Sequence, residues 1–429
     1  MKILIRGGRL VDPAQGLDAP GELCIAAGRV VGCGRVPDGF VANRVIEAGG
    51  RVVAPGLVDL SARLREPGFE YLATLESEMA AAVAGGVTSL ACPPDTDPAL
   101  DEPGLVEMLK YRAQGLNQCR VYPVGALTTA LAGQRLTEMA ELRDAGCVAF
   151  SQAGSPIADT QVLARALSYA ATFDFCVWLQ PQDAYLGHGG FAHDGEVATR
   201  LGLPAIPVTT ETVAIATIVL LMRDTGARVH LCRVSSAAGL EMIRAARAEG
   251  LPLSCDVGVH HLHLSDVDIG WFDSNCHLSP PLRAVRDRDA LRAGAASGLV
   301  DAVCSDHSPV DEDNKQVPFA ESEAGATALE LLLPLTLKWG REMGLGLGET
   351  LARVTTHPAR ILGVQAGSLA EGVAADVCIF DPAQEWLLAP DSLVSQGKNT
   401  PFVGYPLQGR VTQTLVGGNL VFDRQAAER

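Results

Sequence analysis

The feature that most constrains the fold is a regular alternation of two patterns between Val52 and about Leu362. Short runs of β-branched and other apolar residues alternate with longer amphipathic stretches, which is typical of parallel βα units. Eight such runs are present, and eight successive βα units predict a closed (β/α)8 barrel. The predicted strands are Gly56–Leu60, Thr88–Cys92, Arg120–Pro123, Cys147–Ser151, Phe175–Leu179, Arg228–Val234, Leu253–Val257 and Val300–Ser305.

The amphipathic stretches between these runs predict the helices of the barrel wall. Ala and Leu fill their apolar faces, as packing against a sheet requires. The predicted helices are Leu75–Ala84, Pro103–Gln114, Leu136–Ala145, Asp159–Thr172, Glu211–Thr225, Ala237–Glu249, Arg286–Ala295 and Ala326–Met343. An acidic loop, Pro309–Glu323, follows the last strand and is expected on the C-terminal face, where barrel enzymes have their active sites.

The two ends of the chain have a different pattern, with short strands separated by Gly-rich turns. We expect residues 1–53 and 366–429 to meet in one small β-sandwich domain, and residues 54–365 to form the barrel. No stretch has the length and apolar character of a membrane span, and no charged-then-apolar leader is present. We therefore expect a cytoplasmic protein.

The charge balance and the cysteines exclude further classes. The chain has 34 Lys and Arg against 50 Asp and Glu, a formal net charge of −16. Nucleic acids and anionic membranes are bound by clustered Lys and Arg, so neither is an expected partner. The 11 Cys are scattered without a C-x-x-C pair, which predicts reduced thiols and not a disulfide or zinc-ribbon framework.

A family resemblance begins at the first predicted barrel strand. The segment Pro55-Gly-Leu-Val-Asp-Leu-Ser-Ala-Arg-Leu-Arg-Glu-Pro-Gly68 resembles the signature of cyclic amidohydrolases, and most closely of dihydroorotase, which reads P-G-x-x-D-x-H-x-H-L-R-E-P-G. Further motifs follow in the family's order at Gly85–Thr88, Pro93–Thr96, Val259–Leu262, Pro280–Arg283, Ser305–Pro309 and Ala374–Asp376. Because these motifs span nearly the whole chain, it is identified as a member of the dihydroorotase-like amidohydrolases, which implies the same barrel with a small β-domain.

The positions that bind zinc in the family carry other residues in this chain. The two His of the first signature are Ser61 and Arg63, the His after the fifth strand is Gln180, and the second His after the sixth strand is Arg233. After the fourth strand, Ser151-Gln-Ala-Gly154 has no carboxylate or lysine to bridge metals. Asp306, which the family uses as general base, is retained.

These replacements predict that zinc binding and catalysis are lost. A catalytic zinc needs about three protein ligands and a water, whereas a guanidinium stays protonated and has no lone pair to donate. We expect no cofactor and no catalytic residue, with Asp306 as a remnant of the site. We also expect Arg63 and Arg233 to point into the barrel mouth and neutralise Asp306.

The resemblance implies a substrate site that is also altered. Arg65, which in the family binds the carboxylate of dihydroorotate, is retained, and His260 lies in the family's His-His pair. Two family Asn residues are replaced, by Asp95 and Ser279, and the last His of the eighth-strand motif is Val310. An acid at position 95 would repel an anionic substrate, so dihydroorotate should bind weakly or not at all.

Three other groups have both a functional and a structural interpretation. His260, His261 and His263 could form a relocated metal site, but adjacent side chains on an extended segment face opposite ways. His188 and His193 lie in a Gly-rich loop and are expected to be exposed. Cys232 could be an activated thiolate beside Arg233, although a buried strand thiol is the commoner case.

The resemblance also suggests a partner. Inactive chains of this kind resemble the non-catalytic subunits that accompany the aspartate transcarbamoylase catalytic chain in some bacteria and hold its trimers in a larger assembly. We expect this chain to act in that way, as a homodimer within a larger hetero-oligomer. The alternatives are an active cyclic amidohydrolase of dihydroorotase or hydantoinase type with an unorthodox site, and a metabolite sensor that holds a carboxylate through Arg65.

Overall fold

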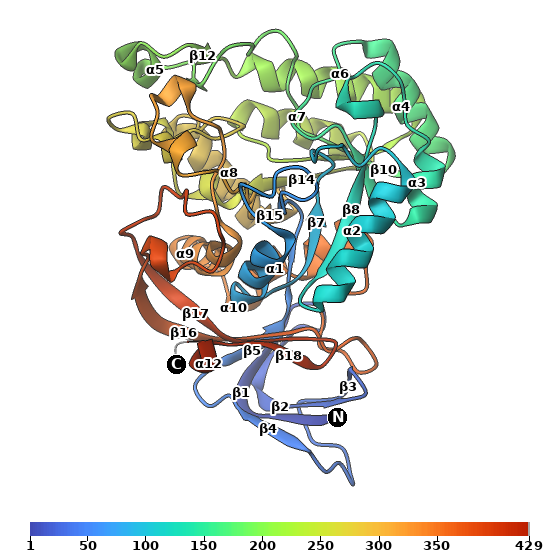
Figure 1. The fold of residues 1–429 in the computed structure, drawn as a ribbon, viewed down its shortest axis with the longest axis vertical. Coiled ribbons are helices and arrows are strands. Elements are labelled where there is room, and N and C mark those ends of the chain that lie inside the picture. The colour runs from blue at the N-terminus through green and yellow to red at the C-terminus, as the bar shows by residue number, and fades with distance from the viewer. Residues whose placement is uncertain (428–429) are drawn as a thin grey trace.

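The computed structural model describes residues 1–427 and contains the predicted barrel (Figure 1). Its eight strands follow one another in the parallel order β6 to β10 and β13 to β15. They are β6 (Leu57–Asp59), β7 (Val87–Cys92), β8 (Arg120–Ala126), β9 (Ala149–Ser151), β10 (Cys176–Leu179), β13 (Arg228–Leu231), β14 (Leu253–Gly258) and β15 (Ala302–Cys304). Each lies within or overlaps one of the runs predicted from sequence.

The two outer strands of this sheet, β6 and β15, meet just beyond their C-terminal ends. Ala62 and His307 form a parallel bridge there, and the amide of His307 donates to the carbonyl of Ser61 at 3.1 Å. Below the bridge, the buried carboxylate of Asp59 accepts hydrogen bonds from the amide of Ser305, at 2.8 Å, and from its hydroxyl. The barrel is therefore joined at the same end that carries the predicted site.

Helices cover the outside of the barrel where the apolar pattern predicted them. They are α1 (Leu75–Ala84), α2 (Pro103–Leu116), α3 (Met139–Ala145), α4 (Thr160–Thr172), α6 (Thr209–Thr225), α7 (Ala237–Ala248), α8 (Val285–Ser297) and α9 (Leu332–Glu342). Four short helices were not predicted: α5 (Glu196–Leu201), α10 (Leu347–Ala352), α11 (Thr356–Leu362) and α12 (Arg424–Ala427). None of the helices in the described part of the chain is long and apolar enough to cross a membrane.

The predicted helix Ala326–Met343 is wrong in its first part, because α9 begins only at Leu332. Ala326 instead forms a parallel bridge with His307. The amides of Ala328 and Leu329 donate to Nδ1 of His307, at 3.1 and 3.4 Å, and Leu329–Leu331 is a single 3-10 turn. These tertiary hydrogen bonds take backbone groups that a helix would have used.

Both ends of the chain contribute to a second sheet, which lies below the barrel in Figure 1, with blue N-terminal and red C-terminal strands side by side. The N-terminal strands are β1 (Lys2–Asp12), β2 (Leu17–Ala26), β3 (Arg29–Cys33), β4 (Arg44–Glu47) and β5 (Val52–Pro55), and the C-terminal ones are β16 (Val377–Leu387), β17 (Pro406–Val416) and β18 (Asn419–Asp423). β5 pairs with both β1 and β16. Gly56 alone separates β5 from β6, and a side chain there would collide with Thr88.

A buried carboxylate with several hydrogen bonds ties helix α1 to the barrel and to the C-terminal segment. Glu78 of α1 is fully buried and accepts hydrogen bonds from His307 at 2.7 Å, from the hydroxyl of Ser395 at 2.6 Å and from the amide of Gln396 at 3.0 Å. Burial raises the pKa of Glu78, but the hydrogen bonds from His307 and Ser395 lower it further, so the net shift is downward.

We predict that Glu78→Gln lowers the free energy of unfolding by about 2 kcal/mol at neutral pH, because a charged acceptor of three buried donors is lost. A lowered pKa gives stabilisation that is complete above the ordinary value of 4.5 and is lost as the pH falls below it. The difference between wild type and variant should therefore shrink in acid. Urea unfolding at several pH values measures it. The exposed Glu76→Gln on the same helix is the control, and an equal effect of both would contradict the prediction.

Candidate functional site

The residues predicted at the barrel mouth all follow the C-terminal ends of barrel strands. Arg63 and Arg65 lie beyond β6, Arg233 beyond β13 and Asp306 beyond β15. Three of them have positive φ angles, 61° at Arg65, 57° at Arg233 and 49° at Asp306. Non-glycine residues rarely adopt this conformation, and they keep it where the surrounding structure holds them. At Arg233 the amide donates to the buried carboxylate of Asp256 at 2.6 Å.

Three of these side chains and that of Asp95, which follows β7, form a largely buried group that we call the arginine cluster: Arg63, Asp95, Arg233 and Asp306. Nη1 of Arg233 lies 2.7 Å and Nη1 of Arg63 lies 3.3 Å from Oδ1 of Asp306. Nε of Arg63 lies 2.7 Å from Oδ2 of Asp95. The two ion pairs expected on Asp306 are therefore present, and the partner of Arg63 at Asp95 is a contact that sequence reasoning missed.

Neutral groups at the edge of the arginine cluster add further hydrogen bonds, although Nε of Arg233 is buried without a partner among the described residues. Nη1 of Arg63 donates to the hydroxyl of Ser308 at 2.7 Å. Nη2 of Arg233 donates to the amide oxygen of Gln180. Gln180 in turn donates to the hydroxyl of Ser279 at 3.4 Å. Two positions that replace metal ligands in the family, Gln180 and Arg233, thus contact each other directly.

Because these side chains are largely buried, the charges of the arginines shift the pKa of the neighbouring carboxylates. The side chains of Arg233 and Asp306 are 5% and 9% exposed, and that of Arg63 is 13% exposed. Burial raises the pKa of Asp306, but the charges of Arg233 and Arg63 lower it more, so the net shift is downward. The same balance, with Arg63 as the main opposing charge, lowers the pKa of Asp95. Both carboxylates therefore stay ionised, and each has low basicity.

The donor atoms at the mouth do not fit the zinc that the fold family implies. Ser61, Arg63, Gln180 and Arg233 supply no imidazole or carboxylate, and both guanidinium groups contact the one remaining candidate ligand, Asp306. Two fixed positive charges at that position oppose a dication. Gln152, near the end of β9, is hydrogen-bonded to Thr128 and to the carbonyl of Leu131 and supplies no carboxylate to bridge metals.

Arg65, the retained substrate-binding position, is already occupied by the chain itself. Its Nε donates to the carbonyl of Pro309 at 2.9 Å, and its Nη2 lies 3.3 Å from Oε1 of Glu323. Both partners belong to the ends of the acidic loop 309–323, which folds over this side of the mouth. An external carboxylate would have to displace Glu323. Sequence reasoning placed the loop at the mouth but missed this pairing.

The histidines do not assemble into a relocated metal site. His260 stacks on Phe402, His261 contacts the carbonyl of Pro280 at 3.1 Å, and His263 contacts the carbonyl of Leu335 at 2.9 Å. They diverge because Val259–Leu262 is a 3-10 turn, not the extended segment that we expected. Burial lowers the pKa of His260 to about 3, so its ring is neutral.

Of the two loop histidines, His188 is exposed as expected, whereas the prediction for His193 is wrong. His193 is buried because β11 (Ala192–His193) pairs with β12 (Ala205–Ile206). Its Nδ1 also lies 3.4 Å from Nη1 of the buried Arg283. Nothing in the local sequence distinguishes His193 from His188, since the pairing partner of His193 is Ile206, much further along the chain.

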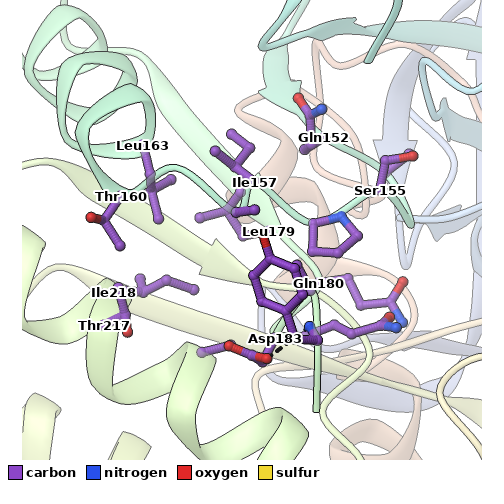
Figure 2. A pocket seen from close by; sticks show the side chains of 17 residues that line it. Gln152, Ser155, Ile157, Thr160, Leu163, Leu179, Gln180, Asp183, Thr217 and Ile218 are labelled. Carbon is purple, nitrogen blue, oxygen red and sulfur yellow. Dashed lines mark hydrogen bonds between the residues drawn. The ribbon is translucent and has the colours of Figure 1, made fainter. Parts of the chain in front are cut away.

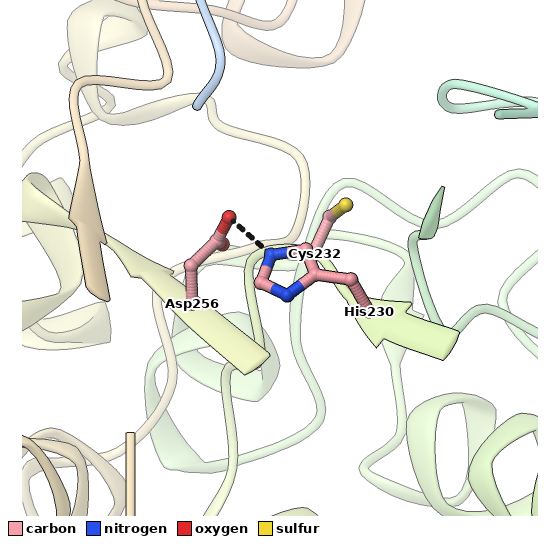
Figure 3. A group of neighbouring side chains, drawn as sticks. All are labelled: His230, Cys232 and Asp256. Carbon is pink, nitrogen blue, oxygen red and sulfur yellow. Dashed lines mark hydrogen bonds and ion pairs between the residues drawn. The ribbon is translucent and has the colours of Figure 1, made fainter. Parts of the chain in front are cut away.

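Sequence reasoning also missed a group formed by His230, Cys232 and Asp256, on and just beyond the neighbouring strands β13 and β14 (Figure 3). Their ligand atoms lie within 4.8 Å of one another, and these are donor types that zinc uses. His230 is, however, already bonded to Asp256 at 3.0 Å and to the hydroxyl of Ser254 at 2.8 Å. Burial and the charge of Asp256 raise the pKa of Cys232 well above its usual range, so it is a protonated thiol and not an activated nucleophile.

Two cavities adjoin the site. The first, of about 90 Å³, lies against α4 and α6, where Leu163, Leu179 and Ile218 make its apolar lining (Figure 2). The second, of about 360 Å³, opens at the mouth and is lined by polar groups that include Gln180, Arg233 and Ser279. Small-molecule pockets usually have volumes of about 300–1,000 Å³, so only the second has room for a metabolite.

The chain is similar to proteins of one family. Residues 50–238 match the family model described as dihydro-orotase-like, and residues 193–421 match that of the amidohydrolase family. The dihydroorotase-like protein of Pseudomonas aeruginosa is 47% identical over 99% of this chain and 100% of its own length. A dihydroorotase of Geobacter sp. strain M21 is 38% identical, with 98% and 99% covered. The L-hydantoinase structure from Arthrobacter aurescens has the same fold, with a TM-score of 0.86 at 24% identity and with 98% and 96% of the two chains covered.

We predict that Asp306→Asn lowers the free energy of unfolding by about 3 kcal/mol, because Arg233 and Arg63 would then share a buried site without their common counter-ion. Arg233→Gln in the Asp306→Asn background should restore part of that loss. Chemical denaturation of the two single variants and the double variant measures the coupling. The exposed Asp313→Asn, in the nearby loop, is the control. Strictly additive effects at positions 233 and 306 would contradict the proposed ion pair.

Proposed function

This chain belongs to the dihydroorotase-like family of amidohydrolases, and we propose that it is a catalytically inactive member that serves as a structural subunit of an aspartate transcarbamoylase complex in pyrimidine biosynthesis. The observation that carries the first half of the proposal is the arginine cluster. Two guanidinium groups hold the one carboxylate that would have served as general base.

The chemistry of the family needs a metal and a base, and this site favours neither. A metal would lower the pKa of a bound water and polarise the amide carbonyl, but both carboxylates of the arginine cluster, Asp95 and Asp306, are already paired with guanidinium groups. Asp306 has a lowered pKa, so it accepts a proton from water poorly. Binding is also opposed, because Arg65 is paired with Glu323.

The rest of the molecule has no corresponding loss, which supports a structural role. The barrel keeps its eight strands, its helical wall and a continuous apolar core. On the surface, the indole of Trp271 is 89% exposed and contacts the half-exposed ring of Phe272, with 6.1 Å between ring centroids. Exposed Trp side chains are frequent anchors of protein interfaces. The neighbouring carboxylate of Asp273 suits a partner with a basic contact face.

The principal alternative is an active cyclic amidohydrolase with an unorthodox site. The mouth cavity of about 360 Å³ and the His230, Cys232 and Asp256 group are the observations in its favour. A carboxylate sensor that uses Arg65 is less well supported, since Glu323 already supplies a carboxylate to that guanidinium.

We predict that the purified chain, incubated with excess zinc and then desalted, retains no tightly bound ion at the mouth and forms no dihydroorotate above a protein-free blank. Elemental analysis and a turnover assay measure the two results. Cys232→Ser is the necessary companion variant, because zinc held by the His230 group would disappear in it. One ion per chain that persists in Cys232→Ser, or clear turnover, would favour the enzyme alternative.

We predict that the chain co-migrates with the aspartate transcarbamoylase catalytic chain of its own organism when the two are co-expressed, and that transcarbamoylase activity depends on it. Size measurement and activity with and without this chain test the prediction. Separate migration, with a transcarbamoylase that is fully active alone, would refute the structural role.

A surface variant makes the same experiment more specific. Trp271→Ala should weaken the association by about 30-fold, the effect of removing an interface anchor worth about 2 kcal/mol. Tyr111→Ala, whose ring is 81% exposed on α2, is the matched control. If the complex forms and Trp271→Ala has no effect, the contact lies elsewhere on the surface.

A further inference from the structure

The end of the barrel opposite the mouth carries a cavity of about 370 Å³. It lies between the starts of β10, β13 and β14 and the last turn of α11, whose Ala359 and Leu362 are buried among side chains of the barrel interior. The cavity thus has a rigid wall of strand ends on one side and a helix end on the other. It shares no residue with the mouth cavity or with the arginine cluster.

Three guanidinium groups line this cavity, from Arg143, Arg228 and Arg360, against one acid, Asp174. The lining therefore carries a net charge of +2 in a chain whose formal charge is −16. Lys110 and Arg120 line a second cavity, of about 390 Å³, which adjoins the first at Val148. Cations are thus gathered on one face of an acidic protein.

These guanidinium groups are only partly engaged within the chain. Arg143 donates to the carbonyls of Cys147 and Val148, at 3.1 and 3.3 Å. Nη2 of Arg228 donates to the carbonyl of Asp174 at 2.8 Å and lies 3.6 Å from the exposed carboxylate of the same residue, and its Nε and Nη1 have no hydrogen bond to a described residue. The guanidinium of Arg360 makes no hydrogen bond or ion pair with any residue that the structure describes. An ion pair this exposed contributes little to the free energy of folding, so the guanidinium of Arg228 can bind another anion at little cost.

We propose that this cavity binds a small molecule that carries two or more linked phosphoryl groups. A guanidinium group binds two phosphate oxygens through parallel N–H bonds. Three guanidinium groups around one cavity can therefore bind more than one phosphoryl group. The volume suits a metabolite and is too small for a macromolecule to enter. The site uses none of the residues on which the proposed structural role depends.

Titration calorimetry of the full chain with pyrophosphate, at constant ionic strength, tests the proposal. We expect one binding event per chain, weakened at least about tenfold in Arg360→Gln, because a charged hydrogen-bond partner is removed. The guanidinium of Arg360 makes no hydrogen bond or ion pair with a described residue, and its backbone carbonyl, which accepts from Gly363, is unchanged in the variant, so this variant should keep the stability of the wild type. Arg228→Gln should weaken binding similarly.

Arg200→Gln is the matched control, since Arg200 is an exposed guanidinium on α5 that lines neither basic cavity. Absence of binding by wild type, or equal weakening in Arg200→Gln and Arg360→Gln, would overturn the site. Inorganic phosphate and succinate complete the series. Succinate binding as tight as that of pyrophosphate would overturn the assignment of linked phosphoryl groups, whereas weaker binding of both probes would support it.

Discussion

The joint between β6 and β15 is the contact on which the rest of the structure depends. At this joint the buried carboxylate of Asp59 holds the amide and hydroxyl of Ser305, and Ala62 pairs with His307. Burial raises the pKa of Asp59 to about 7. Asp306 lies between the two residues that make the joint, and so its backbone position is set by barrel closure. Barrel closure therefore places this carboxylate at the mouth, whether or not it takes part in catalysis.

The arginine cluster supplies at the mouth a cross-link between strands that a bound metal would otherwise provide. Through Arg63, Asp95, Arg233 and Asp306 it connects the ends of β6, β7, β13 and β15, and Gln180 adds β10. Burying a single charge among these strands would be costly, and each is tolerable only because an opposite charge lies within contact distance. Such a cluster holds the strands together, and the guanidinium groups that contact Oδ1 of Asp306 lower the basicity of its carboxylate.

The sequence predicts features that depend on residues close together in the chain better than contacts between distant segments. Strand and helix positions depend on local periodicity, and the eight strands and most helices lie where that periodicity put them. The pairing of Arg63 and Arg233 with Asp306 also followed, since the family motifs place all three at strand ends around one mouth. Contacts made by irregular segments were not predicted. They are the ion pair of Glu323 with Arg65, the pairing of β12 with His193, and the hydrogen bonds of residues 328 and 329 with His307. Each depends on how a loop folds back, and a loop has no periodicity to reveal it.

The uneven placement of charge matters more than its total. At physiological ionic strength, charges farther apart than about 8 Å are largely screened, so an anion inside a cavity responds to the groups that line it and little to the net charge of −16. At the mouth the buried cations are matched by buried carboxylates, and the local charge is close to neutral. At the opposite end Arg143, Arg228 and Arg360 face one exposed acid. An anionic ligand would therefore be drawn to the end of the barrel opposite the mouth and not to the mouth itself, which is the reverse of the usual arrangement in a barrel enzyme.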